Sequence, residues 1–180
     1  MKSHGDGSFR RTDFLKIGQH VIFEKDVLIF HPENIEIGND VYIGHQAILK
    51  GYYKNKLVIG EGSWIGQQVF LHAAGGLVIG KNVGMGPAVK IITSVHEGGP
   101  LSTPILHTPL RFKGVTIEDH SDIGVGTIIL PGVTIGKGAL VGAGSVVTTS
   151  IPPYAIAVGN PARIVKMRTP QEVHENRVIS

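Results

Sequence analysis

The sequence predicts an all-β protein in which the chain coils as a parallel β-helix around a triangular prism in about six turns, with one long loop. Three observations predict this class. Aliphatic residues recur every six positions, glycine is abundant, with 25 copies among 180 residues, and charged residues make up only 17%. An α-helix has a period of 3.6 and an alternating strand a period of two, so neither alone explains a period of six. A short strand followed by a corner does explain it.

The repeat is clearest up to Pro152, where the chain divides without a gap into six hexads that begin at Ile117, Ile123, Ile129, Ile135, Val141 and Val147. Three hexads close a coil of about 18 residues, and stacking such coils about 4.8 Å apart buries the aliphatic positions as a ladder. Glycine follows the aliphatic residue at Gly124, Gly136 and Gly142. We interpret these glycines as supplying the backbone conformations that a sharp corner requires.

The same frame extends back to Ile17 and gives six coils, at 17–36, 37–58, 59–78, 79–116, 117–134 and 135–152. Residues beyond 18 follow the third hexad of each of the first four coils, so the insertions should stack on one corner. The largest insertion, loop 97–114, carries Leu101, Ile105, Leu106, Leu110 and Phe112. A loop of this length in a compact repeat is usually functional, and its apolar residues indicate a neighbouring subunit that covers them.

The two ends lie outside the repeat domain, which we place at 17–168. Residues 1–16 form a polar N-terminal segment without the apolar core of a signal peptide. The hexads fade after Pro152, and Thr169-Pro-Gln-Glu172 has the form of a capping box with proline at the first helical position. We therefore expect a short helix in 169–180 that covers the open edge of the prism.

Composition narrows the functional classes. The absence of cysteine removes disulfides, thiolate metal sites and a cysteine nucleophile. The net charge is only +3, and the basic residues form small clusters rather than a stripe, which argues against nucleic-acid binding. No apolar run approaches the roughly 20 residues of a membrane span. These features favour a cytoplasmic protein.

Four features of the sequence resemble the hexapeptide-repeat acyltransferases: the hexads, Ile129-Leu-Pro-Gly-Val-Thr-Ile-Gly136, Val141-Gly-Ala-Gly-Ser-Val-Val-Thr148 and Gly159-Asn-Pro-Ala-Arg163. The likeness is greatest to sugar O-acetyltransferases of the galactoside, maltose and surface-polysaccharide types. The resemblance implies a left-handed parallel β-helix, a homotrimer with active sites between subunits, and acetyl-CoA as the donor without a metal. It also implies an acceptor that is a sugar or nucleotide sugar of glycan synthesis.

The family's catalytic histidine stands just before the long loop, and His96 matches that position. Transfer from a thioester to a hydroxyl needs a base that removes the proton during attack, a role that neutral imidazole fills near neutral pH. Without cysteine, direct transfer in a ternary complex is the economical mechanism, with backbone N–H groups at a corner stabilising the oxyanion. The carboxylate that orients His96 stays open among Glu97, Glu118, Asp119 and Asp122.

The acceptor residues are predicted from position. His72 lies one coil before His96 and could reach the same groove, and the loop residues Arg111 and Lys113 could meet a diphosphate. Asp122 stands where galactoside-type enzymes carry a tryptophan, and Gly66 aligns with a sugar-contacting asparagine of those enzymes. Both differences argue against a simple galactoside acceptor.

The donor residues are carried over from the family by motif alone. The resemblance implies that Gly124, Ala143 and Thr148 line the pantetheine arm of acetyl-CoA, and that Arg163 and Lys166 lie near its nucleotide phosphates.

Three other functions compete with sugar O-acetylation. An amino sugar attached to a nucleotide would make the protein an N-acetyltransferase, for which a strong base is less important. A zinc carbonic anhydrase of the same fold needs three histidines around one centre, and the spacing of His96, His107 and His120 offers nothing similar to that family's pattern. A purely structural β-helix would have no use for the long loop or the Gly-Asn-Pro-Ala-Arg segment.

Overall fold

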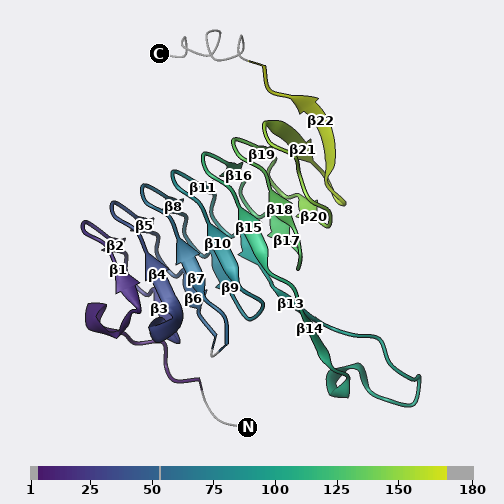
Figure 1. The fold of residues 1–180 in the computed structure, drawn as a ribbon, viewed down its shortest axis with the longest axis horizontal. Coiled ribbons are helices and arrows are strands. Elements are labelled where there is room, and N and C mark those ends of the chain that lie inside the picture. The colour runs from purple at the N-terminus through teal and green to yellow at the C-terminus, as the bar shows by residue number, and fades with distance from the viewer. Residues whose placement is uncertain (1–3, 53, 170–180) are drawn as a thin grey trace.

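The computed structural model describes residues 4–52 and 54–169, which form a prism of stacked coils with one projecting arm (Figure 1). Each coil contributes a short strand to each of three sheets, and strands of successive coils pair in parallel. We refer to the three sheets as faces A, B and C. The parallel β-helix expected from the six-residue repeat is thus confirmed.

The strands follow the coils in order. Face A consists of β1 (Lys16–Ile17), β4 (Ile35–Ile37), β7 (Leu57–Ile59), β10 (Leu77–Ile79), β15 (Val115–Ile117) and β18 (Thr134–Ile135). Face B consists of β2 (Ile22–Phe23), β5 (Tyr42–Ile43), β8 (Trp64–Ile65), β11 (Gly84–Met85), β16 (Asp122–Ile123), β19 (Leu140–Val141), β21 (Ala155–Val158) and β22 (Arg163–Met167). Face C consists of β3 (Leu28–Phe30), β6 (Ile48–Lys50), β9 (Phe70–His72), β12 (Lys90–Ile91), β17 (Ile128–Ile129) and β20 (Val146–Val147).

The core is a set of vertical ladders of aliphatic side chains. On face A one ladder has an exposure of at most 1% for each member: Ile37, Ile59, Ile79, Ile117 and Ile135. Burying one such side chain contributes about 1.5–3 kcal/mol, so the ladders are the main source of stability. The aliphatic residues at the first positions of the hexads are therefore buried as ladders, as the sequence predicts.

The prism has six complete coils and part of a seventh that reaches faces A and B, whereas the sequence indicates six coils. After the sixth coil, Ile151 bridges to Ile135 and β21 pairs with β19. The repeat is hard to see there because the inward positions of β21 hold Ala155 and Ala157, both fully buried, instead of large aliphatic residues. The antiparallel strand β22 then covers the edge of β21. The helix expected in 169–180 lies outside the described residues, apart from Thr169.

The glycines that follow the aliphatic residues have a different role from the predicted one. The positive φ angles fall two residues later, at 70° for Gly126 and 68° for Gly144. Gly124 has no such angle, and a Cβ added to it would lie 2.5 Å from the backbone nitrogen of Ala143 in the next coil. These glycines are needed because stacked corners approach each other closely, and the expectation that they supply the corner's backbone conformations was wrong.

All insertions lie at the corner between faces C and A, as expected, and the largest forms the arm, residues 92–114. Its base is an antiparallel ribbon of β13 (Ser94–His96) and β14 (Leu110–Phe112), and a 3-10 turn, η3 (Ile105–His107), lies near its tip. The arm projects from the prism (Figure 1). It is longer than the predicted loop 97–114, because the chain leaves face C after β12.

The N-terminal segment packs under the first coil. It contains η1 (Arg11–Asp13), and a second turn, η2 (Pro32–Asn34), fills the first inserted corner. Phe9 and Phe14 pack against Phe23 with ring centroids 4.9 and 5.7 Å away. This segment shields the first coil from water. Among residues 4–52 and 54–169, no helix has the length and apolar character needed to cross a membrane.

Candidate active site

His96 lies on β13 at the base of the arm and is half-buried. Its Nδ1 lies 3.1 Å from the carbonyl oxygen of Thr108, on the returning side of the arm. A carbonyl can only accept a hydrogen bond, so Nδ1 carries the proton and Nε2 keeps its lone pair. Nε2 has no hydrogen-bond partner among the described residues. The arm therefore holds the imidazole in the tautomer that a general base requires.

None of the four carboxylates considered from the sequence is the partner of His96. Glu97 faces the guanidinium of Arg111, with 3.6 Å between Oε1 and Nε. Glu118 and Asp119 accept hydrogen bonds from backbone N–H groups of Lys137 and Lys81. Asp122 lies on face B. The expectation of a carboxylate was wrong: because the arm folds back on itself, the backbone carbonyl of Thr108 supplies the contact, and no sequence pattern indicates it.

His72 ends β9 on face C, at the side of the prism where the arm begins. Its ring stacks on Phe70 and meets the edge of Tyr52, with centroids 6.1 and 5.8 Å away. Its Nδ1 is buried without a hydrogen-bond partner. Burial, followed by the positive charge of Lys50, lowers the pKa of His72 below its ordinary value of 6.5. The imidazole is thus a neutral group with an unused polar atom.

Thr93, a residue that the sequence did not single out, ties His72 to the start of the arm. Its hydroxyl donates to the carbonyl of His72 at 2.7 Å and accepts from the N–H of Gly75 at 2.8 Å. Its own carbonyl accepts from the N–H of Lys113 at 3.0 Å, where the arm returns. This fully buried threonine therefore fixes both ends of the arm against the prism.

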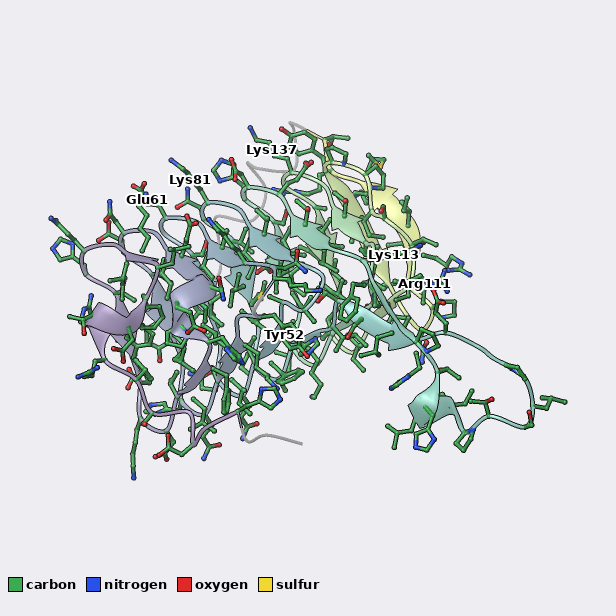
Figure 2. The ribbon with its side chains drawn as sticks, turned by 60° about the horizontal axis from the view of Figure 1, so that its bottom comes forward. Tyr52, Glu61, Lys81, Arg111, Lys113 and Lys137 are labelled. Atoms are coloured by element: carbon green, nitrogen blue, oxygen red, sulfur yellow. The ribbon has the colours of Figure 1, made fainter. Side chains whose placement is uncertain are left out.

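Arg111 and Lys113 are both exposed at the base of the arm (Figure 2). The charge of Arg111 is partly offset by Glu97 on the opposite strand. The stem of Lys113 lies over Gly132, because a Cβ added there would lie 3.0 Å from its Cδ. In the antiparallel ribbon Arg111 pairs with Val95, the residue before His96, so the base of the arm presents exposed positive charge near the imidazole.

The predicted donor residues gather at the C-terminal end of the prism. Gly124 and Ala143 stack at the corner between faces B and C, and the N–H of Gly142 bonds to the carbonyl of Ala157 in the partial coil. Space outside this corner is open, since a Cβ added to Gly126 or Gly144 would meet nothing within 4 Å. The result is a strip of bare backbone.

The other predicted donor residues, Arg163, Lys166 and Thr148, lie at different distances from this strip. Arg163 begins β22 and pairs with Val158, which lies against Gly142. Lys166 pairs with Ile156 further along the same edge strand. Thr148 is exposed at the end of face C, in the column that begins with Phe30 and includes His72. The structure thus brings Gly124, Ala143 and Arg163 to one corner, with Thr148 and Lys166 on its two sides.

Face B contains an aromatic surface that sequence reasoning missed. Its outward row consists of Ile22, Tyr42, Trp64, Gly84, Asp122, Leu140 and Ile156. Trp64 is 41% exposed and its ring stacks on that of Tyr42, with 5.4 Å between centroids and 4° between planes. A signal was present: Trp64 is the sole tryptophan, and it precedes a hexad's aliphatic residue just as Asp122 does. Asp122 therefore lies opposite the corner that carries His96.

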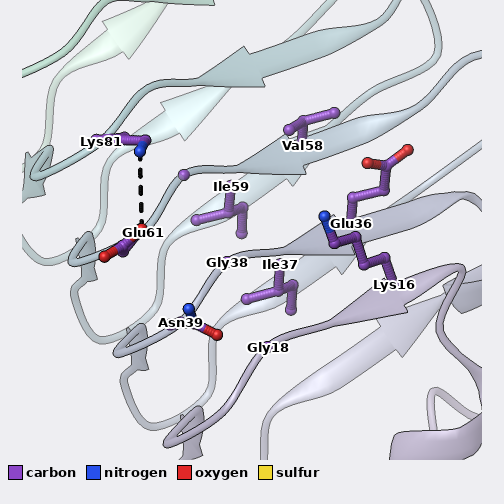
Figure 3. A pocket seen from close by; sticks show the side chains of 11 residues that line it. Lys16, Gly18, Glu36, Ile37, Gly38, Asn39, Val58, Ile59, Glu61 and Lys81 are labelled. Carbon is purple, nitrogen blue, oxygen red and sulfur yellow. Dashed lines mark ion pairs between the residues drawn. The ribbon is translucent and has the colours of Figure 1, made fainter.

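Face A bears two shallow hollows. The larger, of about 310 Å³, is lined by the backbone of three glycines and by charged side chains that include Lys16, Glu36, Glu61 and Lys81 (Figure 3). Lys81 and Glu61 form an ion pair of 3.7 Å across it. Glu118 and Asp119, two of the carboxylates considered for His96, line the smaller hollow, and none of the predicted catalytic, acceptor or donor residues lines either. Within the described parts of the chain, no group of three or more histidine or acidic side chains is arranged to hold a metal ion.

No protein-family model matches the chain. A putative acetyltransferase of Schizosaccharomyces pombe is 44% identical over 91 residues, which cover 50% of this chain and 42% of that protein. The putative colanic acid biosynthesis acetyltransferase WcaF of Escherichia coli is 31% identical over 137 residues, covering 76% of this chain and 71% of WcaF. The chain belongs to the hexapeptide-repeat acyltransferase family.

Solved structures agree with this membership. A variant of AntD, an N-acyltransferase from Bacillus cereus in complex with dTDP and coenzyme A, has a TM-score of 0.78 and 28% identity, covering 94% of this chain and 95% of AntD. A maltose O-acetyltransferase from Clostridium difficile has a TM-score of 0.58 and 30% identity, covering 88% and 72%. Family members of known structure thus include both O- and N-acyltransferases.

Proposed function

We propose that this protein transfers an acetyl group from acetyl-CoA to a hydroxyl of a sugar or glycan precursor, with His96 as the general base. The single observation that carries the proposal is the contact of His96 with the Thr108 carbonyl, which leaves Nε2 free to accept a proton. Family membership and the similarity to WcaF support the same class of reaction. The match covers under half of the S. pombe relative, so the substrates are inferred from chemistry.

The proposed reaction is direct. The acceptor oxygen attacks the thioester carbonyl carbon while its proton passes to Nε2 of His96, and the carbonyl oxygen becomes an oxyanion bound by backbone N–H groups. The C–S bond then breaks, and the imidazolium returns the proton to the sulfur of coenzyme A. Acetyl-CoA supplies the activated acyl group. The chain needs no nucleophile of its own, in keeping with its lack of cysteine.

The bare corner of the last coils fits a donor of this shape. Gly124, Gly126, Ala143 and Gly144 present backbone with almost no side chain, and two of these positions have open space outside them. A narrow pantetheine arm could approach that backbone closely, with Thr148 beside it. Arg163 and Lys166 would then meet the phosphates as charge-assisted hydrogen-bond donors.

We also propose that the site is completed in a homotrimer. The arm exposes large apolar side chains, with Leu101 fully exposed and Leu106 exposed by 74%. Asp122 lies on face B. The strip of bare backbone at Gly124 and Ala143, which we call the donor strip, lies at the corner between faces B and C. Both are away from the arm of the same copy. A cyclic contact, in which the arm of one copy lies against the next copy, would bury the apolar side chains of the arm. It would also bring the arm to Asp122 and the donor strip of that next copy.

The test is the His96→Asn variant, measured once an acceptor is found by an acetylation screen of free sugars and nucleotide sugars. A hydroxyl acceptor needs its proton removed during attack, so kcat should fall about 10²- to 10⁴-fold. Calorimetry should find acetyl-CoA affinity unchanged. Turnover near that of the wild type would sink general-base catalysis by His96.

N-acetylation of a nucleotide-linked amino sugar is the second candidate, favoured by the similarity to AntD, whose structure contains dTDP and coenzyme A. Arg111 and Lys113 would meet the diphosphate of such an acceptor. An amine attacks without a strong base, so His96→Asn would then keep most of its activity. The same variant therefore separates the two candidates.

A further inference from the structure

We propose that the outward row of face B from Trp64 to Asp122 is the acceptor subsite, and that it takes a pyranose ring stacked on the indole of Trp64. A hydroxyl or amino group at the edge of that ring would donate to the Asp122 carboxylate. This inference rests on the proposed acyl transfer and names the part of its site that holds the acceptor.

The stacked rings of Trp64 and Tyr42 form a rigid, flat platform. The ring of Tyr42 lies parallel to the indole, within 4°, and holds it from the coil below. Trp64 is 41% exposed, and Ile22, two coils below it in the same row, is 53% exposed, so an apolar surface faces solvent where a sheet's outer side is usually polar. The C–H face of a pyranose packs well on the electron-rich face of an aromatic ring. The indole N–H has no hydrogen-bond partner among the described residues.

A notch lies directly above the platform. Gly84 separates Trp64 from Asp122 in the row and offers no side chain. The carboxylate of Asp122 leans over it, because a Cβ added to Gly84 would overlap Oδ1. That carboxylate accepts no hydrogen bond from any described residue. Coils rise by about 4.8 Å, so the gap of two coils between Trp64 and Asp122 has about the size of one sugar ring.

The height of the notch matches the proposed chemistry. Gly84 belongs to the fourth coil, and the arm that carries His96 leaves the prism from this same coil. In a ring of copies that stand side by side with parallel axes, rotation keeps every residue at its own height. His96 of the partner subunit would therefore face the notch at Gly84. The donor strip at Gly124 and Ala143 begins one coil higher, so acyl donor and acceptor would meet end to end.

The fluorescence of Trp64 tests binding without activity, because this is the sole tryptophan of the chain. Methyl glucoside, methyl galactoside and dTDP-glucose would each be titrated into the wild-type protein while its emission is followed. We expect a saturable change with at least one of them, weakened about tenfold in Asp122→Asn. If none of these sugars changes the emission, or if Asp122→Asn responds like the wild type, the subsite is not there.

Kinetics give the second readout. Trp64→Ala should raise the acceptor KM about tenfold and leave the KM for acetyl-CoA unchanged, and Trp64→Phe should recover most of the loss. Val78→Ala, which changes an exposed apolar residue on face A, is the matched control and should alter neither constant. An unchanged acceptor KM in Trp64→Ala would overturn the inference. General-base catalysis by His96 is tested separately, by the kcat of His96→Asn. If that test contradicts the proposed function, the change in Trp64 emission on sugar binding would still be expected.

Discussion

The contact between His96 and the Thr108 carbonyl fixes a tautomer without placing a full negative charge beside the imidazole. The neighbouring Glu97 is engaged with Arg111 on the surface of the arm. We therefore predict that Glu97→Gln changes kcat by no more than about twofold, as expected for a surface pair. Steady-state kinetics beside His96→Asn would measure this. A loss comparable to that of His96→Asn would mean that the carboxylate, and not the carbonyl, supports the base.

Thr93 gives a second prediction at this scale. Thr93→Val keeps the shape of the side chain but leaves the N–H of Gly75 and the carbonyl of His72 without their hydroxyl partner. Buried polar groups left unsatisfied in this way cost about 1–3 kcal/mol each, so urea unfolding should show a loss of at least that size. Thr103→Val, on the projecting part of the arm, is the control. Equal stability of the two variants would contradict the assigned role.

His72 makes stability depend on pH. Burial, with help from Lys50, lowers its pKa in the folded protein, so the unfolded chain binds more protons at this site as the pH falls below about 6.5. The free energy of unfolding should therefore decline from about pH 7 to about pH 5, and His72→Gln should flatten that decline. Urea unfolding at both pH values measures it. His107→Gln, exposed on the arm, should keep the wild-type slope; if His72→Gln keeps it too, the imidazole is not destabilised by burial.

At the scale of the strand and corner, Gly84 on face B and Gly124 at the corner after face B have different tolerances for a side chain. A Cβ added to Gly124 would lie 2.5 Å from the backbone of Ala143, which cannot move without separating two coils. A Cβ added to Gly84 meets only the end of the Asp122 side chain, which can swing away. The stacking of coils thus excludes a side chain at Gly124 but not at Gly84.

We predict that Gly124→Ala lowers the melting temperature by several degrees, through an overpacking cost of about 1–3 kcal/mol. Gly84→Ala should melt within about two degrees of the wild type, since a flexible side chain is all that must move. Thermal unfolding followed by circular dichroism compares them. If Gly84→Ala is the more destabilised of the two, the spacing of the coils is not what selects glycine at the corner of Gly124.

At the scale of the whole molecule, the arm links fold to assembly. Its apolar residues Leu101, Ile105 and Leu106 are exposed by 107%, 59% and 74%, and contribute little to the protomer. We predict that the wild type sediments as a trimer of the 19.2 kDa chain, and that replacing all three residues with serine shifts the equilibrium toward monomer. The circular dichroism spectrum should not change. A trimer that survives the triple replacement undiminished would place the interface elsewhere.

The order of the amino acids was enough to predict the ladder of aliphatic residues, the three-sided coil, the single inserted corner and the membership of the acyltransferase family. Each of these follows from a signal carried within one hexad or one motif, where residues six positions apart face the same way. The seventh coil was the exception, because the small residues Ala155 and Ala157 fill its core and do not stand out.

Which residues meet across coils became visible only in the folded chain. Trp64 and Gly84 are 20 positions apart in the chain, and Gly84 and Asp122 are 38 apart because the arm intervenes, yet the three are consecutive in one row of face B. The partner of His96 likewise depends on how the arm folds back at Thr108. Backbone hydrogen bonds between stacked coils set this register, and inserted residues change the numbering without changing the stack.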